Sequence, residues 1–149
     1  MERFEAKNLG GIQSLWLVPL EDVTIPAGGS IRREDMLLAE GKNWIRILFT
    51  PQTAEFSDTR EITRAGDVYR KRISFWVPSL RVEVSALFQS LCGISLAALI
   101  LDNNNRMRLV YPLRMEYGAQ VPREVAGYNG YHVELQGRNT FESPFVVES

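Results

Sequence analysis

Hydrophobic and polar residues alternate with a period of two over residues 68–77, which is the pattern of a half-buried β-strand. One face of this strand carries Tyr69, Lys71, Ile73, Phe75 and Val77, and the other carries Arg70, Arg72, Ser74 and Trp76. The first set is mostly apolar, whereas arginines between apolar residues are typical of a solvated or interface face.

The period changes after Pro78. Large apolar residues then recur at helical spacing, and all lie on one side of an α-helix: Leu80, Val84, Leu87, Phe88 and Leu91. Ser79 is suited to be the N-cap of this helix, and Gly93 suits the position just after its end. The pattern predicts one helix over residues 79–92.

The remaining apolar runs predict further strands. Residues 20–42 read as an irregular connection, in which 34–40 could be a short helical turn or a short strand. Asp102 to Asn105 reads as a hairpin turn, because Asn and Asp tolerate left-handed backbone. The expected strands are 13–19, 43–50, 96–101, 107–111, 113–117 and 131–137, with a short edge strand in the tail at 144–148. The chain of 149 residues is therefore expected to be a single mainly β domain, an antiparallel β-sandwich or barrel with one flanking helix.

The connection between the strands at 44–49 and 73–77 is unusually long and polar. Hairpin loops usually have two to five residues, whereas Thr50 to Lys71 adds a largely charged or polar segment. We expect residues 50–71 to form a protruding arm, with the first strand extended through about Phe56, a charged tip, and a return at about Gly66. The candidate contacts of this arm with another subunit are Glu55, Phe56, Asp58, Arg60, Glu61, Arg64, Asp67 and Arg70.

Composition narrows the possible chemistry. The formal net charge is -1, so bulk charge gives no reason to expect nucleic-acid or membrane binding. Basic and aromatic residues near Trp76 and Tyr111 would suit nucleic acid, but a solvated strand face explains them better. With a single cysteine, Cys92, the chain can form no internal disulfide or thiolate metal cluster.

No catalytic, cofactor-binding or metal-binding residues are expected. His132, the one histidine, alternates with Tyr131 and Val133 in an expected strand and should face the opposite side, as a surface residue. Cys92 reads as a structural thiol at a helix end, and a Cys92–His132 nucleophile pair has no supporting motif. The N-terminal residues do not resemble a secretory signal, so we expect a soluble protein made in the cytoplasm.

The order of the elements resembles the tail-tube and related tail proteins of long-tailed bacteriophages, particularly small tail-type proteins of bacterial prophages. The resemblance covers about residues 43–145. It rests on four segments: FTPQTAEFSDTREITRAGDVYRKRISFWVP (49–78), the helix end at Leu91-Cys92-Gly93, LILDNNNRMRLV (99–110) and GYHVELQGRNTFESPF (130–145). The turn at Asn103 to Asn105 departs from the family, which often has Gly there.

This resemblance implies a structural, non-enzymatic protein that forms hexameric rings stacked around a channel, which would allow DNA to pass. It implies that the long connector reaches a neighbouring subunit or ring, and that the protein moves from the host cytoplasm into the virion tail with other tail proteins. Terminator, connector and baseplate roles stay open. The alternative is a cellular β-sandwich module that binds a sugar, peptide or protein through Trp44, Trp76, Tyr128 and Tyr131.

Overall fold

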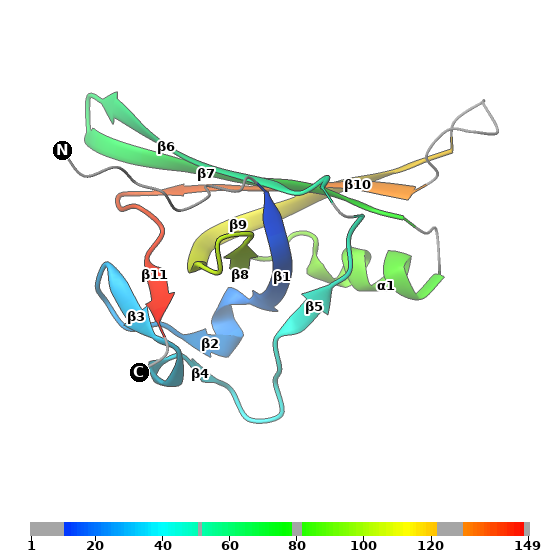
Figure 1. Ribbon diagram of the computed structural model, residues 1–149, viewed down its shortest axis with the longest axis horizontal. Helices are drawn as coiled ribbons and strands as arrows, with labels where there is room; N and C mark the ends of the chain where they lie inside the picture. The colour runs from blue at the N-terminus through cyan, green and yellow to red at the C-terminus, as the bar shows by residue number, and fades with distance from the viewer. Residues whose placement is uncertain (1–10, 51, 79–81, 122–129, 148–149) are drawn as a thin grey trace.

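The computed structural model describes residues 11–50, 52–78, 82–121 and 130–147 (Figure 1). These residues form a mainly antiparallel β-structure with one α-helix and two short 3₁₀ turns, Leu20–Asp22 and Arg33–Asp35. In chain order the elements are β1 (Ile12–Pro19), β2 (Val23–Thr24), β3 (Ser30–Arg32), β4 (Leu37–Leu38), β5 (Ile45–Ile47), β6 (Glu55–Thr63), β7 (Gly66–Val77), α1 (Val82–Leu91), β8 (Leu96–Asp102), β9 (Met107–Gln120), β10 (Gly130–Asn139) and β11 (Phe145–Val147).

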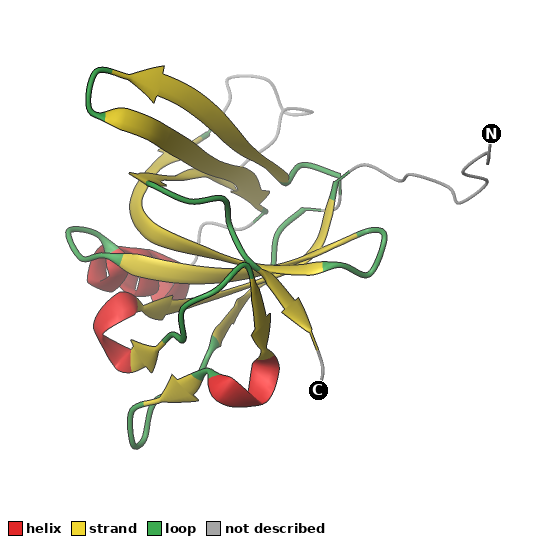
Figure 2. Cartoon of the chain, turned by 90° about the vertical axis from the view of Figure 1, so that its left-hand side faces the viewer, coloured by secondary structure: helices red, strands yellow, loops and turns green. Residues whose placement is uncertain are grey.

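One nine-stranded sheet contains most of the strands. Seven of them follow the order β5-β1-β8-β9-β10-β7-β6, and the other two, β11 and β3, join it where β11 pairs with β9. Its central strand, β9, is long enough to belong to two layers. The first part of β9 pairs with β8 as far as Leu113, and the second part pairs with β10 from Arg114 onward. The β6–β7–β10 part consequently lies over β1, β8 and the start of β9, which cross beneath it (Figures 1 and 2).

The main core fills the space between these layers. The apolar face predicted for residues 68–77 points into it, since Ile73, Phe75 and Val77 are all buried. Strand β8 is buried on both faces, with Ala98 and Ile100 in the main core and Ala97 and Leu99 in a second core. Its uninterrupted apolar sequence is the pattern of a strand covered on both sides.

Helix α1 covers one end of the main core. The Phe88 ring centroid lies 5.3 Å from that of Tyr117 and 5.5 Å from that of Tyr131. The helix ends as its sequence predicts: the Cys92 amide donates to the Phe88 carbonyl, and Gly93 follows with a φ of +82°. The expected N-cap, Ser79, lies outside the described residues. Within the described part of the chain, no helix is long and apolar enough to cross a membrane.

The fold class is confirmed, as are the strands near 13–19, 68–77, 96–101 and 131–137. The strand expected at 43–50 is wrong in extent, because β5 covers only Ile45–Ile47 and pairs with β1. The chain then leaves that layer, and the Thr50 amide donates to the Trp76 carbonyl at the end of β7. The run therefore crosses between layers instead of continuing as a strand into the arm.

Three smaller expectations also change. The strands expected at 107–111 and 113–117 are one strand, β9, whose register with β8 shifts by one residue beside Pro112. The tail strand β11 is not an edge, because it lies between β9 and β3. The stretch 20–42 contains the short strands β2, β3 and β4, and its 34–40 part holds both a helical turn and a strand.

Candidate assembly surface: the β6–β7 hairpin

The predicted arm is a hairpin of its own, made by β6 and the first half of β7. Cross-strand pairing runs from Glu55 opposite Ser74 to Thr63 opposite Gly66, and Arg64 and Ala65 form the turn. Strand β7 also pairs with β10, but that pairing ends at Tyr69 opposite Asn139. Beyond Tyr69 the hairpin is a two-stranded ribbon that extends past the sheet (Figures 1 and 2).

Each face of this ribbon carries one diagonal ion pair. Arg60 Nη2 lies 2.6 Å from Asp67 Oδ2 on one face, and Arg70 Nε lies 2.8 Å from Glu61 Oε2 on the other. The hydrogen bond from Arg60 to Asp67 raises the pKa of the Arg60 guanidinium. All four side chains are largely solvent-exposed, so these pairs contribute little stability and act mainly to fix the register of the ribbon.

The turn of the ribbon is held by local bonds. Thr63 Oγ1 donates to the Gly66 carbonyl at 2.7 Å and accepts from the Ala65 amide at 3.3 Å. Gly66 has a φ of +118°, which side chains other than glycine rarely adopt. Ile62, the second-last residue of β6, is 84% exposed. The ribbon therefore has a defined shape and an apolar side chain at its tip.

The base of the arm is fixed by a buried ion pair. Lys71 Nζ lies 3.0 Å from Asp58 Oδ2, and the two side chains are 0% and 4% exposed. Nζ also donates to Ser143 Oγ at 2.9 Å and to the Phe141 carbonyl at 3.0 Å, which uses all three of its protons. The Ser143 amide donates to the same Asp58 oxygen at 2.7 Å. This cluster ties β6, β7 and the segment before β11 together.

Burial carries an energetic cost for both charged groups of this cluster. It lowers the pKa of the Lys71 ammonium, although the hydrogen bond and charge of Asp58 act to raise it. Asp58 Oδ1 is buried with no hydrogen-bond partner among the described residues, which adds a desolvation cost. An ion pair closed off from water is sensitive to the loss of either member, because the remaining charge is left without a partner.

Strand β6 forms one open edge of the sheet, since it pairs with β7 alone among the described strands. Unpaired backbone groups along an edge can accept another strand. Glu55, Arg60 and Glu61 place charges along this edge, and charges on an edge oppose indiscriminate pairing. A strand that pairs here must therefore match those charges.

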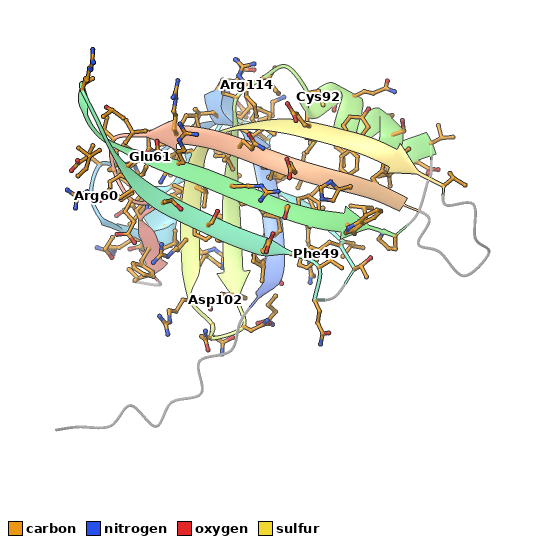
Figure 3. The ribbon with its side chains drawn as sticks, turned by 90° about the horizontal axis from the view of Figure 1, so that it is seen from above. Phe49, Arg60, Glu61, Cys92, Asp102 and Arg114 are labelled. Carbon is orange, nitrogen blue, oxygen red and sulfur yellow. The ribbon has the colours of Figure 1, made fainter. Side chains whose placement is uncertain are left out.

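The structure separates the expected arm contacts into two groups. Arg60, Glu61, Asp67 and Arg70 lie together in the ribbon, and Arg64 is in its turn. Figure 3 shows Arg60 and Glu61 on the ribbon. Phe56 instead packs against the main core, Asp58 is buried with Lys71, and Glu55 accepts a hydrogen bond from Ser74 at 3.3 Å. These three residues belong to the base of the hairpin, and Asp58 in particular has no surface to offer a neighbour.

The cluster around Lys71 was missed from the sequence. Its signal was present, because Lys71 is the one charged residue on an otherwise apolar strand face. A two-residue turn at Arg64-Ala65 places Asp58 directly opposite Lys71. Ser143 could not be inferred, since it comes from a distant part of the chain.

Residues with catalytic potential are not brought together. His132 faces away from the core, as expected, and its ring lies 5.4 Å from that of Trp76. The Cys92 thiol points to the Met115 carbonyl at 3.7 Å, and burial raises the pKa of this thiol. No group of three or more His, Cys, Asp or Glu suited to a metal ion occurs within the ranges that the structure describes.

The aromatic residues of the binding-module alternative do not form one surface. Tyr131 is buried in the main core, and Trp44 packs against the second core. Trp76 is partly buried beside His132, and Tyr128 lies outside the described residues. Comparison of the chain with protein-family models, with curated proteins and with solved structures finds no significant match.

Proposed function

We propose that this chain is a non-enzymatic structural subunit of a phage or prophage tail, which assembles into rings or a tube through its strand edges and the β6–β7 hairpin. One observation carries the proposal: beyond Tyr69 the hairpin has a fixed register and shape but pairs with no further strand among the described residues. An isolated two-stranded ribbon is only marginally stable in water. A neighbouring subunit that packs against this ribbon would stabilise it, and such a contact explains why the ribbon protrudes.

The anchoring of the hairpin supports the same function. The buried pair of Lys71 and Asp58 holds its base against the segment before β11. A contact element that is already ordered loses less conformational entropy on binding than a flexible loop. The ribbon is thus suited to repeated, identical contacts, as a ring or tube requires.

The charge pattern of the ribbon is suited to a specific partner. Its two exposed ion pairs and the turn residue Arg64 present both signs of charge in a fixed order. Such patterns select orientation and partner more than they raise affinity. The simplest partner is a second copy of the chain, because every copy carries the same surfaces and the contact can therefore repeat.

Electron microscopy of the purified chain tests this function. We expect negatively stained preparations at high protein concentration to contain rings or short tubes of uniform diameter. Genes for capsid, portal, tape-measure or lysis proteins next to the gene for this chain would agree with the proposal. A chain that stays monomeric at every concentration, encoded beside a transporter or glycoside hydrolase, would contradict it.

A further inference from the structure

The surface of the chain has an apolar groove at the end of the molecule opposite the ribbon tip. The groove has a volume of about 320 Å³ and lies between α1, the end of β7 and the stretch that follows β5. Its main lining residues are Ile47, Leu48, Phe49, Val84, Leu87 and Phe88. The hairpin turn and α1 lie at opposite ends of the long axis (Figure 1), and Phe49 lies far along the molecule from Arg60 and Glu61 (Figure 3).

Both ends expose apolar side chains that a monomer leaves in water. Leu48 on the rim of the groove is 72% exposed, and Val82 at the start of α1 is 84% exposed. Ile62 at the ribbon tip is also 84% exposed. The groove with Leu48 on its rim is concave and apolar, whereas Ile62 is an apolar side chain that projects from a narrow ribbon. The groove and the ribbon tip therefore fit each other in shape, and both present apolar surface.

The charges beside these apolar groups are complementary as well. Arg64, next to Ile62 at the tip, has no acidic partner within the described part of the chain, and Glu83, on the first turn of α1, has no basic partner there. At the groove, Arg46 likewise has no ion pair among the described residues, whereas Asp67 at the tip is already paired with Arg60. The tip therefore offers the unpaired positive charge of Arg64, and the first turn of α1 offers the unpaired negative charge of Glu83.

We propose that the groove receives the ribbon tip of a second copy of this chain, with Ile62 inserted between α1 and Leu48 and with Arg64 beside Glu83. This inference rests on the proposed assembly function and names the contact that performs it. The two surfaces are different patches of one molecule, so the contact is head-to-tail. A head-to-tail contact closes into a ring or continues as a filament, according to the rotation between copies.

Disulfide trapping tests the contact directly. Two single variants, Ile62→Cys and Leu48→Cys, are made in a Cys92→Ala background and mixed under mild oxidation. We expect the mixture to give cross-linked dimers that contain one copy of each variant, while each variant alone gives little. Val147→Cys, which is also a partly exposed apolar position but lies on β11, is the matched control and should not cross-link with either partner. A strong dimer of Ile62→Cys with itself would overturn the head-to-tail contact.

Substitutions at the two surfaces give an independent measurement. Ile62→Asp and Leu48→Glu should each raise the concentration of half-assembly about tenfold or more, because each removes the burial of one large apolar side chain. Val147→Asp should leave it unchanged. Arg64→Glu and Glu83→Arg should each weaken assembly, and the double variant Arg64→Glu/Glu83→Arg should restore it, since the pair is then reversed but still complementary.

The outcomes separate this inference from the function on which it rests. If the wild-type chain assembles but Ile62→Asp and Leu48→Glu assemble equally well, the groove contact is wrong while the structural function stands. If the wild-type chain never assembles and no cross-link forms, both are wrong. Circular dichroism of each variant shows whether the fold is retained, and both substituted side chains are exposed enough that we expect it to be.

Discussion

Lys71 and Asp58 form an ion pair with a 3.0 Å Nζ–Oδ2 distance, and both side chains are buried. The pair joins the two strands of the hairpin at the point where the hairpin leaves the body of the domain. Ser143 and the Phe141 carbonyl complete the coordination of Nζ. The protruding ribbon is therefore attached to the body of the domain through this buried cluster.

Removing the carboxylate should destabilise the whole domain. Asp58→Ala leaves the Lys71 ammonium buried without its counter-charge, and we expect a loss of about 3–5 kcal/mol in the free energy of unfolding. The double variant Asp58→Leu/Lys71→Met should lose less, because no buried charge remains. Urea denaturation measures both, with Glu61→Ala in the exposed pair as a control that should change little. An Asp58→Ala variant as stable as wild type would show that the pair does not anchor the hairpin.

The buried lysine should also make stability depend on pH in the alkaline range. Burial lowers the pKa of Lys71 below its ordinary value of 10.5. Between the lowered pKa and 10.5 the unfolded chain binds more protons than the folded chain, so the free energy of unfolding increases as the pH rises. We expect wild type to gain stability relative to Lys71→Met across this window. Denaturation curves collected from neutral pH to pH 10.5 would reveal the trend, and an opposite slope would contradict the assignment.

Gly137 is required where β10 passes the bend of β9. A Cβ atom at Gly137 would lie 1.8 Å from the Pro112 carbonyl oxygen, which belongs to the backbone and has little room to move. Gly137→Ala should therefore cost about 1–3 kcal/mol or more of stability. Gly118→Ala is the matched control, because nothing lies within 4 Å of the added atom there. Equal melting temperatures for the two variants would show that β10 does not pass so close to β9.

Much of the fold could be predicted from local patterns, and the failures have a common cause. The alternation over 68–77 and the helix that ends at Gly93 were clear because each pattern reports one buried face. The run from Trp44 to Phe49 looked like one strand, but Leu48 is exposed and Phe49 packs on Phe75 while the chain crosses to the other layer. Such a crossing is decided by tertiary packing, and local propensity does not report it.

The candidate site shows the same division. The sequence predicted that residues 50–71 protrude and return near Gly66, and it identified the exposed charges of the ribbon. It did not separate the buried Asp58 from the exposed Asp67, because both are aspartates in one polar stretch. Only the register, set by the turn at Arg64-Ala65, places Asp58 against Lys71. The groove at α1 is formed by segments far apart in the chain and had no local signal.

Sedimentation velocity of a tip-shortened variant tests the central claim, that the ribbon mediates assembly. Replacing Ile62–Asp67 by Asn-Gly joins Glu61 to Val68, which already face each other, through a favourable hairpin turn. Each strand loses two residues, and the two turn residues are replaced. Every remaining side chain therefore stays on its original face of the hairpin, and Asp58 stays opposite Lys71. We expect wild type to form larger species as its concentration rises and the shortened variant to stay monomeric with an unchanged melting temperature. If the shortened variant assembles as wild type does, the β6–β7 ribbon is not the assembly element.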